Sequence, residues 1–193
     1  IAVSKDEAER LRFWSGRKNA FPAAGRIKAD VASQADVDRM FDAVGETLGG
    51  LDALINNAGI AGPTGGVDEI DPAEWRRCLD VCLTGQFLCA RRAVPMLKAA
   101  GGGSIVNMSS AMSHLVDSGF VAYGASKAAL NHMTRLLAIE WAPRVRVNAV
   151  AAGATLTDAL EAFTAMPELK DQMVAMTPMK RLGAPEDIAA AVV

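Results

Sequence analysis

Residues 101–142 read GGGSIVNMSSAMSHLVDSGFVAYGASKAALNHMTRLLAIEWA, and this stretch determines the expected fold. A short apolar run at 104–108 follows three glycines, which is typical of a buried parallel strand. Ser109 and Ser110 close that strand, and the apolar-rich segment after them predicts a helix that reaches Trp141. A buried strand followed by a helix is the repeating unit of an α/β fold.

Tyr123 and Lys127 stand four residues apart on the predicted helix. Positions i and i+4 share a helix face, so the phenol and the ammonium can reach one place. A free phenol has a pKa of about 10, and a nearby cation favours the phenolate. We therefore expect Lys127 to lower the pKa of Tyr123 and make it an acid–base catalyst, with the Ser110 hydroxyl holding a carbonyl or alcohol beside it. The alternative for such a pair is a surface tyrosine with a solvated lysine.

Four segments of the chain resemble the short-chain dehydrogenase/reductase family: NNAG at 56–59, SIVNMSS at 104–110, YGASKAAL at 123–130 and RVRVNAVAAG at 144–153. The resemblance runs in order over nearly all 193 residues. It implies a nicotinamide-dependent oxidoreductase on a Rossmann sheet, acting on a small-molecule carbonyl or secondary alcohol. It places Ser110, Tyr123 and Lys127 in the catalytic positions, with Tyr123 and Lys127 also holding the nicotinamide ribose. A non-catalytic Rossmann module that retains the fold is the alternative.

The rest of the chain alternates short apolar runs with amphipathic segments, which predicts a doubly wound parallel sheet between two helix layers. We expect one Rossmann-type domain over residues 1–193. Ser33 and Asp71 are expected to cap helices. The predicted strands are 1–3, 25–31, 51–56, 104–108 and 145–150, and the predicted helices are 7–14, 35–48, 72–99, 123–141 and one that starts at Pro185.

No glycine-rich turn precedes Ile1, although a dinucleotide-binding fold normally begins with a strand and such a turn. In the family that the chain resembles, another strand also follows the helix that begins here at Pro185. We therefore expect an internal fragment that is incomplete at both ends of the fold.

Asn57, Ala58 and Gly59 follow a predicted strand at the carboxyl edge of the sheet, where ligands bind in such folds. The small Ala58 and Gly59 let a nucleotide approach the backbone, and the alternative is an ordinary turn. Asp30 and Val31 match the adenine-contacting pair of the family, while an aspartate that caps the next helix is the alternative for Asp30.

Gly153 and Thr157 match the family segment that edges the nicotinamide site, with Ala152 where the family usually has proline. Ser4 and Lys5 fall where the family selects its cofactor. A serine followed by a lysine lacks the acidic residue that binds the ribose of NAD, and it offers a cation to a 2′-phosphate. This favours NADP(H), with NAD(H) as the alternative.

The net charge of −2 gives no indication of nucleic acid or of an anionic membrane as a partner. The chain has neither an apolar run of spanning length nor a signal-peptide layout at its start, so a cytoplasmic protein is expected. Cys78, Cys82 and Cys89 lie in one predicted helix far from both histidines, which favours buried thiols over a metal site. The family resemblance implies a homo-oligomer, a dimer or tetramer, that pairs the helices at 72–99 and 122–142.

Cys82 departs from the family pattern, which usually has asparagine there to interrupt the helix and hold a water beside the lysine. A thiol is a weak donor and acceptor, so Cys82 is expected either to hold that water poorly or to pack. His114 is interpreted as a wall of the substrate pocket or as an exposed loop residue. The methionines are interpreted as an adaptable pocket lining or as helix packing; they are Met166, Met173, Met176 and Met179.

Overall fold

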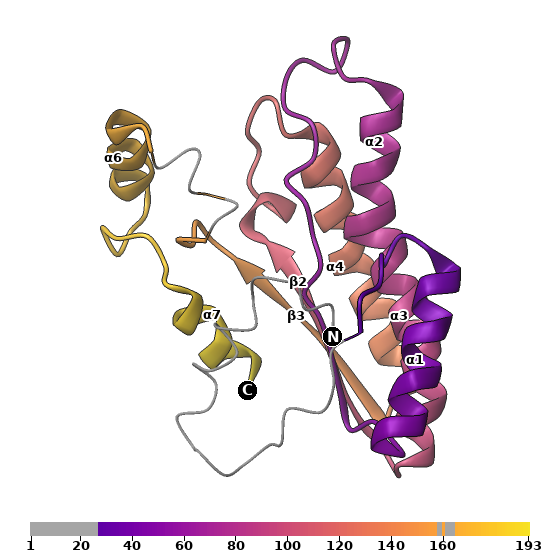
Figure 1. The fold of residues 1–193 in the computed structure, drawn as a ribbon. Coiled ribbons are helices and arrows are strands. Elements are labelled where there is room, and N and C mark those ends of the chain that lie inside the picture. The colour runs from indigo at the N-terminus through magenta and orange to yellow at the C-terminus, as the bar shows by residue number, and fades with distance from the viewer. Residues whose placement is uncertain (1–26, 158–159, 161–164) are drawn as a thin grey trace.

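The computed structural model describes residues 27–157, 160 and 165–193 (Figure 1). Three parallel strands form a sheet in the order β1-β2-β3. They are β1 (Ala53–Asn56), β2 (Gly103–Ser110) and β3 (Val145–Ala152). All three strands run the same way, so their carboxyl ends meet at one edge of the sheet. The predicted α/β class with a parallel sheet is confirmed.

Helices lie on both faces of this sheet, as a doubly wound fold requires (Figure 1). One face is covered by α3 and α4, with α1 packed on α3 and α2 packed on α4, and α7 packs on β3 from the other side. Their bounds are α1 (Gln34–Leu48), α2 (Pro72–Leu79), α3 (Gly85–Ala99), α4 (Val121–Trp141), α6 (Pro167–Met176) and α7 (Pro185–Val192).

The helix starts agree with the capping residues expected from the sequence. The Ser33 hydroxyl accepts a hydrogen bond from the Asp36 amide at 3.3 Å and caps α1. Asp71 accepts from the Ala73 amide at 2.8 Å and caps α2, with Pro72 in the first turn. The helix predicted at 72–99 reaches Ala99 as expected, but one π-helical turn at Asp80–Thr84 separates α2 from α3.

The main core lies between the sheet and the helices that cover it. Leu54, Ile105 and Val147 come from adjacent strands and are buried, and they pack with Leu97 of α3. Leu130 of α4 is also fully buried. Burying such side chains stabilises a fold by about 1.5–3 kcal/mol each, which holds the strand ends, and the side chains that follow them, in fixed positions.

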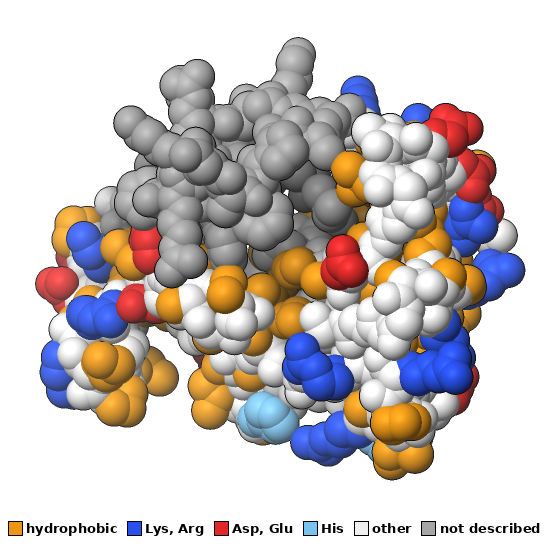
Figure 2. Space-filling model, turned by 90° about the horizontal axis from the view of Figure 1, so that it is seen from below, with side chains coloured by type: hydrophobic (Ala, Val, Ile, Leu, Met, Phe, Trp, Pro, Cys, Tyr) orange, Lys and Arg blue, Asp and Glu red, His pale blue; other side chains and the backbone are white. Residues whose placement is uncertain are grey.

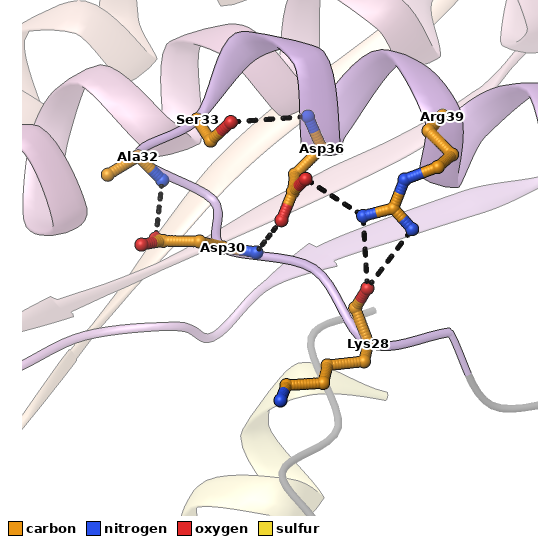
Figure 3. Close-up of polar contacts among 6 residues, drawn as sticks. All are labelled: Lys28, Asp30, Ala32, Ser33, Asp36 and Arg39. Carbon is orange, nitrogen blue, oxygen red and sulfur yellow. Dashed lines mark hydrogen bonds and ion pairs between the residues drawn. The ribbon is translucent and has the colours of Figure 1, made fainter.

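The strand predicted at 25–31 is wrong for its described part, because residues 27–30 are irregular and Val31 begins a turn. Side chains of α1 bind this backbone where a neighbouring strand would (Figure 3). The Asp30 amide donates to Asp36 at 2.9 Å, and Arg39 donates to the Lys28 carbonyl at 3.4 and 3.5 Å. Within the described ranges no strand pairs with this segment, and a strand requires a partner for its backbone groups.

Some predictions lie outside the described residues, and the interpretations of the methionines concern side chains that the structure exposes. The strand at 1–3, the helix at 7–14, Ser4 and Lys5 are not among the described residues. The α6 region carries exposed methionines: Met166, Met176 and Met179 are 50%, 83% and 73% exposed. Figure 2 shows apolar side chains, in orange, at the left of the molecule, which is the side on which α6 lies in Figure 1. Neither a pocket lining nor helix packing describes these three side chains.

Every helix within residues 27–157, 160 and 165–193 is too short or too polar to cross a membrane.

Gly85 begins α3 at a point of close approach to Val31. A Cβ added to Gly85 would lie 2.8 Å from Val31 Cγ2 and 2.9 Å from the Val31 carbonyl oxygen. Gly45 in α1 is the opposite case, since the nearest atom to an added Cβ is Met96 Cε at 4.0 Å. The same substitution should therefore have opposite effects at the two positions.

We predict that Gly85→Ala lowers the free energy of unfolding by about 1–3 kcal/mol through overpacking. The matched control Gly45→Ala should raise it by about 0.5–1 kcal/mol, because alanine is the better helix former. Urea unfolding of the full-length protein, followed by circular dichroism, measures both changes. A Gly85→Ala protein as stable as the wild type would contradict the close packing against Val31.

Candidate active site

The structure brings together Ser110, Tyr123 and Lys127, which the sequence had singled out. Ser110 is the last residue of β2, and the other two lie in the first two turns of α4. Burial raises the pKa of the Tyr123 phenol, and the Ser110 hydroxyl is close enough to lower it in part. The Lys127 ammonium lies 5.6 Å from the centroid of the Tyr123 ring, within the range of a cation–π interaction.

Lys127 is a buried cation, with 3% of its surface exposed. Its Nζ donates a hydrogen bond to the Met108 carbonyl oxygen at 2.7 Å. Burial lowers the pKa of Lys127, and the nearby thiols of Cys82 and Cys78 partly oppose this. No ion pair to Lys127 forms within the described ranges, so a peptide carbonyl and an aromatic face are what stabilise its charge.

The pKa of Tyr123 is raised, whereas we had expected Lys127 to lower it. Burial of the phenol is the main cause, and the Ser110 hydroxyl acts in the opposite direction. The expectation was wrong because Lys127 directs its ammonium to Met108 and lies over the ring, and because removing a phenolate from water is costly. Tyr123 therefore holds its proton more firmly here than a phenol in water does.

Ser110 is oriented by the turn that follows it. Its hydroxyl accepts from the Met112 amide at 3.2 Å, which caps the 3₁₀ turn Ala111–Ser113. Ser113 donates to the Ser110 carbonyl at 2.6 Å and accepts from Asn131 of α4 at 2.7 Å. Asn131 also lies 3.2 Å from His114 Nε2. The His114 side chain is exposed, which agrees with its interpretation as an exposed loop residue.

The turn after β1 reaches Lys127. A Cβ added to Gly59 would lie 3.7 Å from Lys127 Nζ, so this backbone and the buried ammonium are neighbours. Ala58 is half-buried and Asn57 is exposed. Gln86 of α3 donates to the Ala58 carbonyl at 3.3 Å and holds the turn from below. The small residues leave the backbone open to a ligand at this edge.

A buried polar chain that the sequence analysis missed ties the strands to α4. Asn56 donates to Asn107 at 2.9 Å, and Asn107 donates to Thr134 at 2.9 Å. Asn56 also donates to the Gln86 carbonyl at 3.3 Å. The only sequence signal was an asparagine inside each of two apolar strands. These bonds fix the carboxyl ends of β1 and β2 relative to α4.

Val31, next to Asp30 in the chain, lines a small hollow of about 10 Å³ under the turn after β1. Asp30 accepts from the Ala32 amide at 3.0 Å and from Arg77 of α2 at 3.0 Å. These bonds hold the pKa of the Asp30 carboxyl below its usual range. Ser33 caps α1, so the capping interpretation of Asp30 is wrong. Arg77 is a second residue that sequence reasoning missed.

Gly153 and Thr157 follow β3 at the same edge of the sheet. No atom lies within 4 Å of a Cβ added to Gly153, which leaves this backbone open. Thr157 is exposed. Thr155 donates to the Gly153 carbonyl at 3.0 Å and bridges to Gly183, so it shapes the segment that the sequence assigned to the nicotinamide side.

The three cysteines are free and buried. Cys82 lies in the π turn, where it donates to the Ile60 carbonyl at 3.3 Å and accepts from the Ile60 amide at 3.5 Å. Cys78 packs beside it, and burial raises the pKa of Cys78 to about 11. Cys89 packs in the main core. In the part of the chain that the structure describes, no group of three or more His, Cys, Asp or Glu could hold a metal ion.

Comparison with known proteins identifies the class to which this site belongs. A family model described as enoyl-(acyl carrier protein) reductase matches residues 3–193. The cis-4-hydroxycyclohexanecarboxylate dehydrogenase of Sinomonas cyclohexanicum is 36% identical over 193 residues, which are 100% of this chain and 75% of that protein. The chain belongs to the short-chain dehydrogenase/reductase family, whose members are NAD(P)-dependent oxidoreductases of alcohol and carbonyl groups.

Solved structures of the same fold hold either cofactor. A gluconate 5-dehydrogenase from Burkholderia cenocepacia, in complex with NADP and tartrate, has a TM-score of 0.84 at 29% identity, with 95% of this chain and 70% of that chain covered. A 7α-hydroxysteroid dehydrogenase complexed with NADH and 7-oxo glycochenodeoxycholic acid has a TM-score of 0.81 at 33% identity, with 86% and 64% covered. The likeness confirms the Rossmann-like fold.

We predict that burying the charge of Lys127 lowers the free energy of unfolding. Lys127→Met should raise the free energy of unfolding at pH 7 by about 1 kcal/mol, because it removes a buried cation without a carboxylate partner. The folded-state pKa of Lys127 is lowered. The cost of burying its charge is therefore fully present below that pKa and falls as the pH rises toward the unfolded value.

The difference between Lys127→Met and the wild type should accordingly shrink as the pH is raised from 7 to 10. Lys127→Arg is the matched control, because arginine keeps its charge throughout this range. Neither variant titrates there, so the stability of both relative to the wild type should fall by the same amount as the pH rises. Urea unfolding at both pH values measures these differences. A wild type more stable than Lys127→Met at pH 7 would contradict the prediction.

Proposed function

We propose that this protein transfers hydride between nicotinamide C4 and the carbon of a carbonyl or secondary alcohol, with Ser110, Tyr123 and Lys127 as its catalytic residues. The observation that carries the proposal is the buried Lys127 ammonium 5.6 Å from the centroid of the Tyr123 ring, with Ser110 at the end of β2 near enough to influence the phenol. Two hydroxyls near the carboxyl end of a central strand can bind one substrate oxygen. We also propose that residues 1–193 form one Rossmann-type domain.

In reduction, the Tyr123 hydroxyl gives its proton to the substrate oxygen, and in oxidation the phenolate takes it back. Burial raises the pKa of Tyr123, so the phenol is a weaker acid here than in water. Ser110 donates a hydrogen bond to the same oxygen and orients it. Lys127 would hold the nicotinamide ribose, the second role that the family resemblance gives it. NAD(P)H supplies the hydride when it is bound.

The cofactor site that we propose follows the carboxyl edge of the sheet. Asn57, Ala58 and Gly59 approach its nucleotide portion, and the openness of the backbone at Gly59 beside Lys127 supports this. Asp30 and Val31 lie at the adenine end. Tyr123, Lys127, Gly153 and Thr157 would hold the nicotinamide portion.

The substrate is a small alcohol or carbonyl compound. The relatives described above act on an alicyclic hydroxy acid, a sugar acid and a bile acid, which share a secondary alcohol or its ketone. We propose no narrower class, because one fold supports many substrates.

We propose a homo-oligomer, a dimer or tetramer, that pairs the long helices of each copy. The outer surfaces of α3 and α4 support this, because they expose apolar side chains: Phe87, Leu136 and Ile139 are 45%, 53% and 80% exposed. Large apolar side chains gathered on a surface are typical of an interface with another protein.

Tyr123→Phe tests the mechanism. In the full-length protein this variant should lose about 10²–10⁴ in kcat for carbonyl reduction, because the positioned proton donor is removed. Its affinity for NADPH, measured by fluorescence titration, should change little. Turnover at the wild-type rate would overturn the mechanism, and a wild type that binds NADPH without turning over any carbonyl substrate would favour the non-catalytic module.

NADPH should bind more tightly than NADH, because Ser4-Lys5 replaces an acidic end to the strand and Lys5 offers a cation to the 2′-phosphate. Titrating both cofactors into the full-length protein measures the ratio of their Kd values. Lys5→Glu should reverse that ratio, while the conservative Lys5→Arg should keep it. Tighter binding of NADH by the wild type would show that Ser4 and Lys5 do not select the cofactor.

A further inference from the structure

Asn131 lies on the face of α4 that carries Tyr123 and Lys127. The three residues are spaced four apart in the helix, so Asn131 continues that face by one turn. Its side chain is half-buried, and its Nδ2 lies 2.7 Å from the Ser113 hydroxyl in the 3₁₀ turn after β2. The proposed mechanism gives Asn131 no role, although it reaches the turn that begins at Ser110.

The hydrogen bonds around Ser113 can run in only one direction. A peptide carbonyl only accepts, so the Ser113 hydroxyl must donate its single proton to the Ser110 carbonyl oxygen, at 2.6 Å. Ser113 then has no proton for Asn131 and must accept from it. The amide of Asn131 therefore presents its nitrogen to Ser113, and the bonds run from Asn131 to Ser113 and on to Ser110.

The second N–H of the Asn131 amide also reaches this loop. Nδ2 lies 3.2 Å from His114 Nε2, which accepts when the ring carries its proton on Nδ1. Both donors of one side chain of α4 are thus directed at two consecutive residues of the segment after β2. An amide used in this way fixes the segment relative to the helix.

The turn in turn determines where the Ser110 hydroxyl points. Its oxygen accepts from the Met112 amide at 3.2 Å, which leaves its proton for another acceptor. The turn also lies on the first turn of α4, because a Cβ added to Gly124 would be 3.4 Å from the Met112 carbonyl oxygen. Asn131 and Ser113 hold it at a second point, so the turn cannot rotate about the first one.

We propose that Asn131 is a positioning residue, which acts through Ser113 to fix the Ser110 carbonyl and so aims the Ser110 hydroxyl at the substrate oxygen. The inference rests on the proposed function, because it requires Ser110 to bind that oxygen. A small misplacement of a group that orients the substrate can lower the rate by up to about 10²-fold. The loss should therefore appear in kcat and not in the binding of cofactor.

Asn131→Asp tests the direction of the bonds, because it keeps the shape of the side chain and replaces its N–H donors with acceptors. The Ser113 proton should turn to the new carboxylate, a stronger acceptor than a carbonyl, and the Ser110 carbonyl should lose its donor. In the full-length protein we expect kcat for the reduction of cyclohexanone by NADPH to fall about tenfold, with the Kd for NADPH nearly unchanged. Ser113→Ala should lose a similar amount, and the conservative Ser113→Thr should retain the wild-type kcat.

Double variants determine whether Asn131 acts through Ser113 and Ser110. If it does, Asn131→Asp should cause no further loss of kcat when it is combined with Ser113→Ala or with Ser110→Ala. The added negative charge is present in both combinations, so an effect of charge alone would persist in them. A loss that persists, or a wild-type kcat in Asn131→Asp itself, would overturn the inference.

Amide hydrogen exchange of residues 110–115, followed by mass spectrometry, tests the same bonds without turnover. Asn131→Asp should exchange faster there than the wild type, because fewer bonds hold the turn. Equal exchange in the two proteins would overturn the inference whatever their activity. A Ser110→Ala protein that reduces cyclohexanone at the wild-type rate would instead overturn the role of Ser110 in the proposed function.

Discussion

The hydrogen bond from the Lys127 ammonium to the Met108 carbonyl oxygen, 2.7 Å long, is the contact on which the site depends. A cation removed from water must find acceptors, and this one finds a carbonyl near the end of β2 and the ring of Tyr123. The bond therefore holds the start of α4 against the end of the central strand. As a result the Tyr123 phenol, one helical turn before the lysine, lies beside Ser110.

The same edge is held together by amides. Asn56 and Asn107 bind one another across β1 and β2, and Asn107 continues to Thr134 on α4. Inside a core such hydrogen bonds are strong only when every polar group in the series is paired. This series of bonds therefore sets the relative positions of two strands and one helix. Gln86 extends this arrangement to the Ala58 turn and leaves one oxygen unused.

Some predictions failed where the outcome depended on a distant partner. The segment at 27–31 has the composition of a strand, but side chains of α1 bind its backbone and no neighbouring strand does so in the described part of the chain. The pKa of Tyr123 rises because burial outweighs the nearby cation, and spacing along a helix cannot measure burial. The two hydrogen bonds that Cys82 in the π turn forms with Ile60 also depend on a distant partner, since Ile60 lies 22 residues away in the chain.

The sequence by itself determined the local elements and the motif residues: the caps Ser33 and Asp71, the helix that reaches Ala99, the strand that ends at Ser110, and the Tyr123–Lys127 pair. These follow from periodicity and from hydrogen bonds between near neighbours, which any stretch of chain carries with it. Only the tertiary structure decided which buried polar groups are paired, how the phenol titrates and where an acceptor stays free. Those properties depend on desolvation, and desolvation is set by residues that the chain brings together only when it folds.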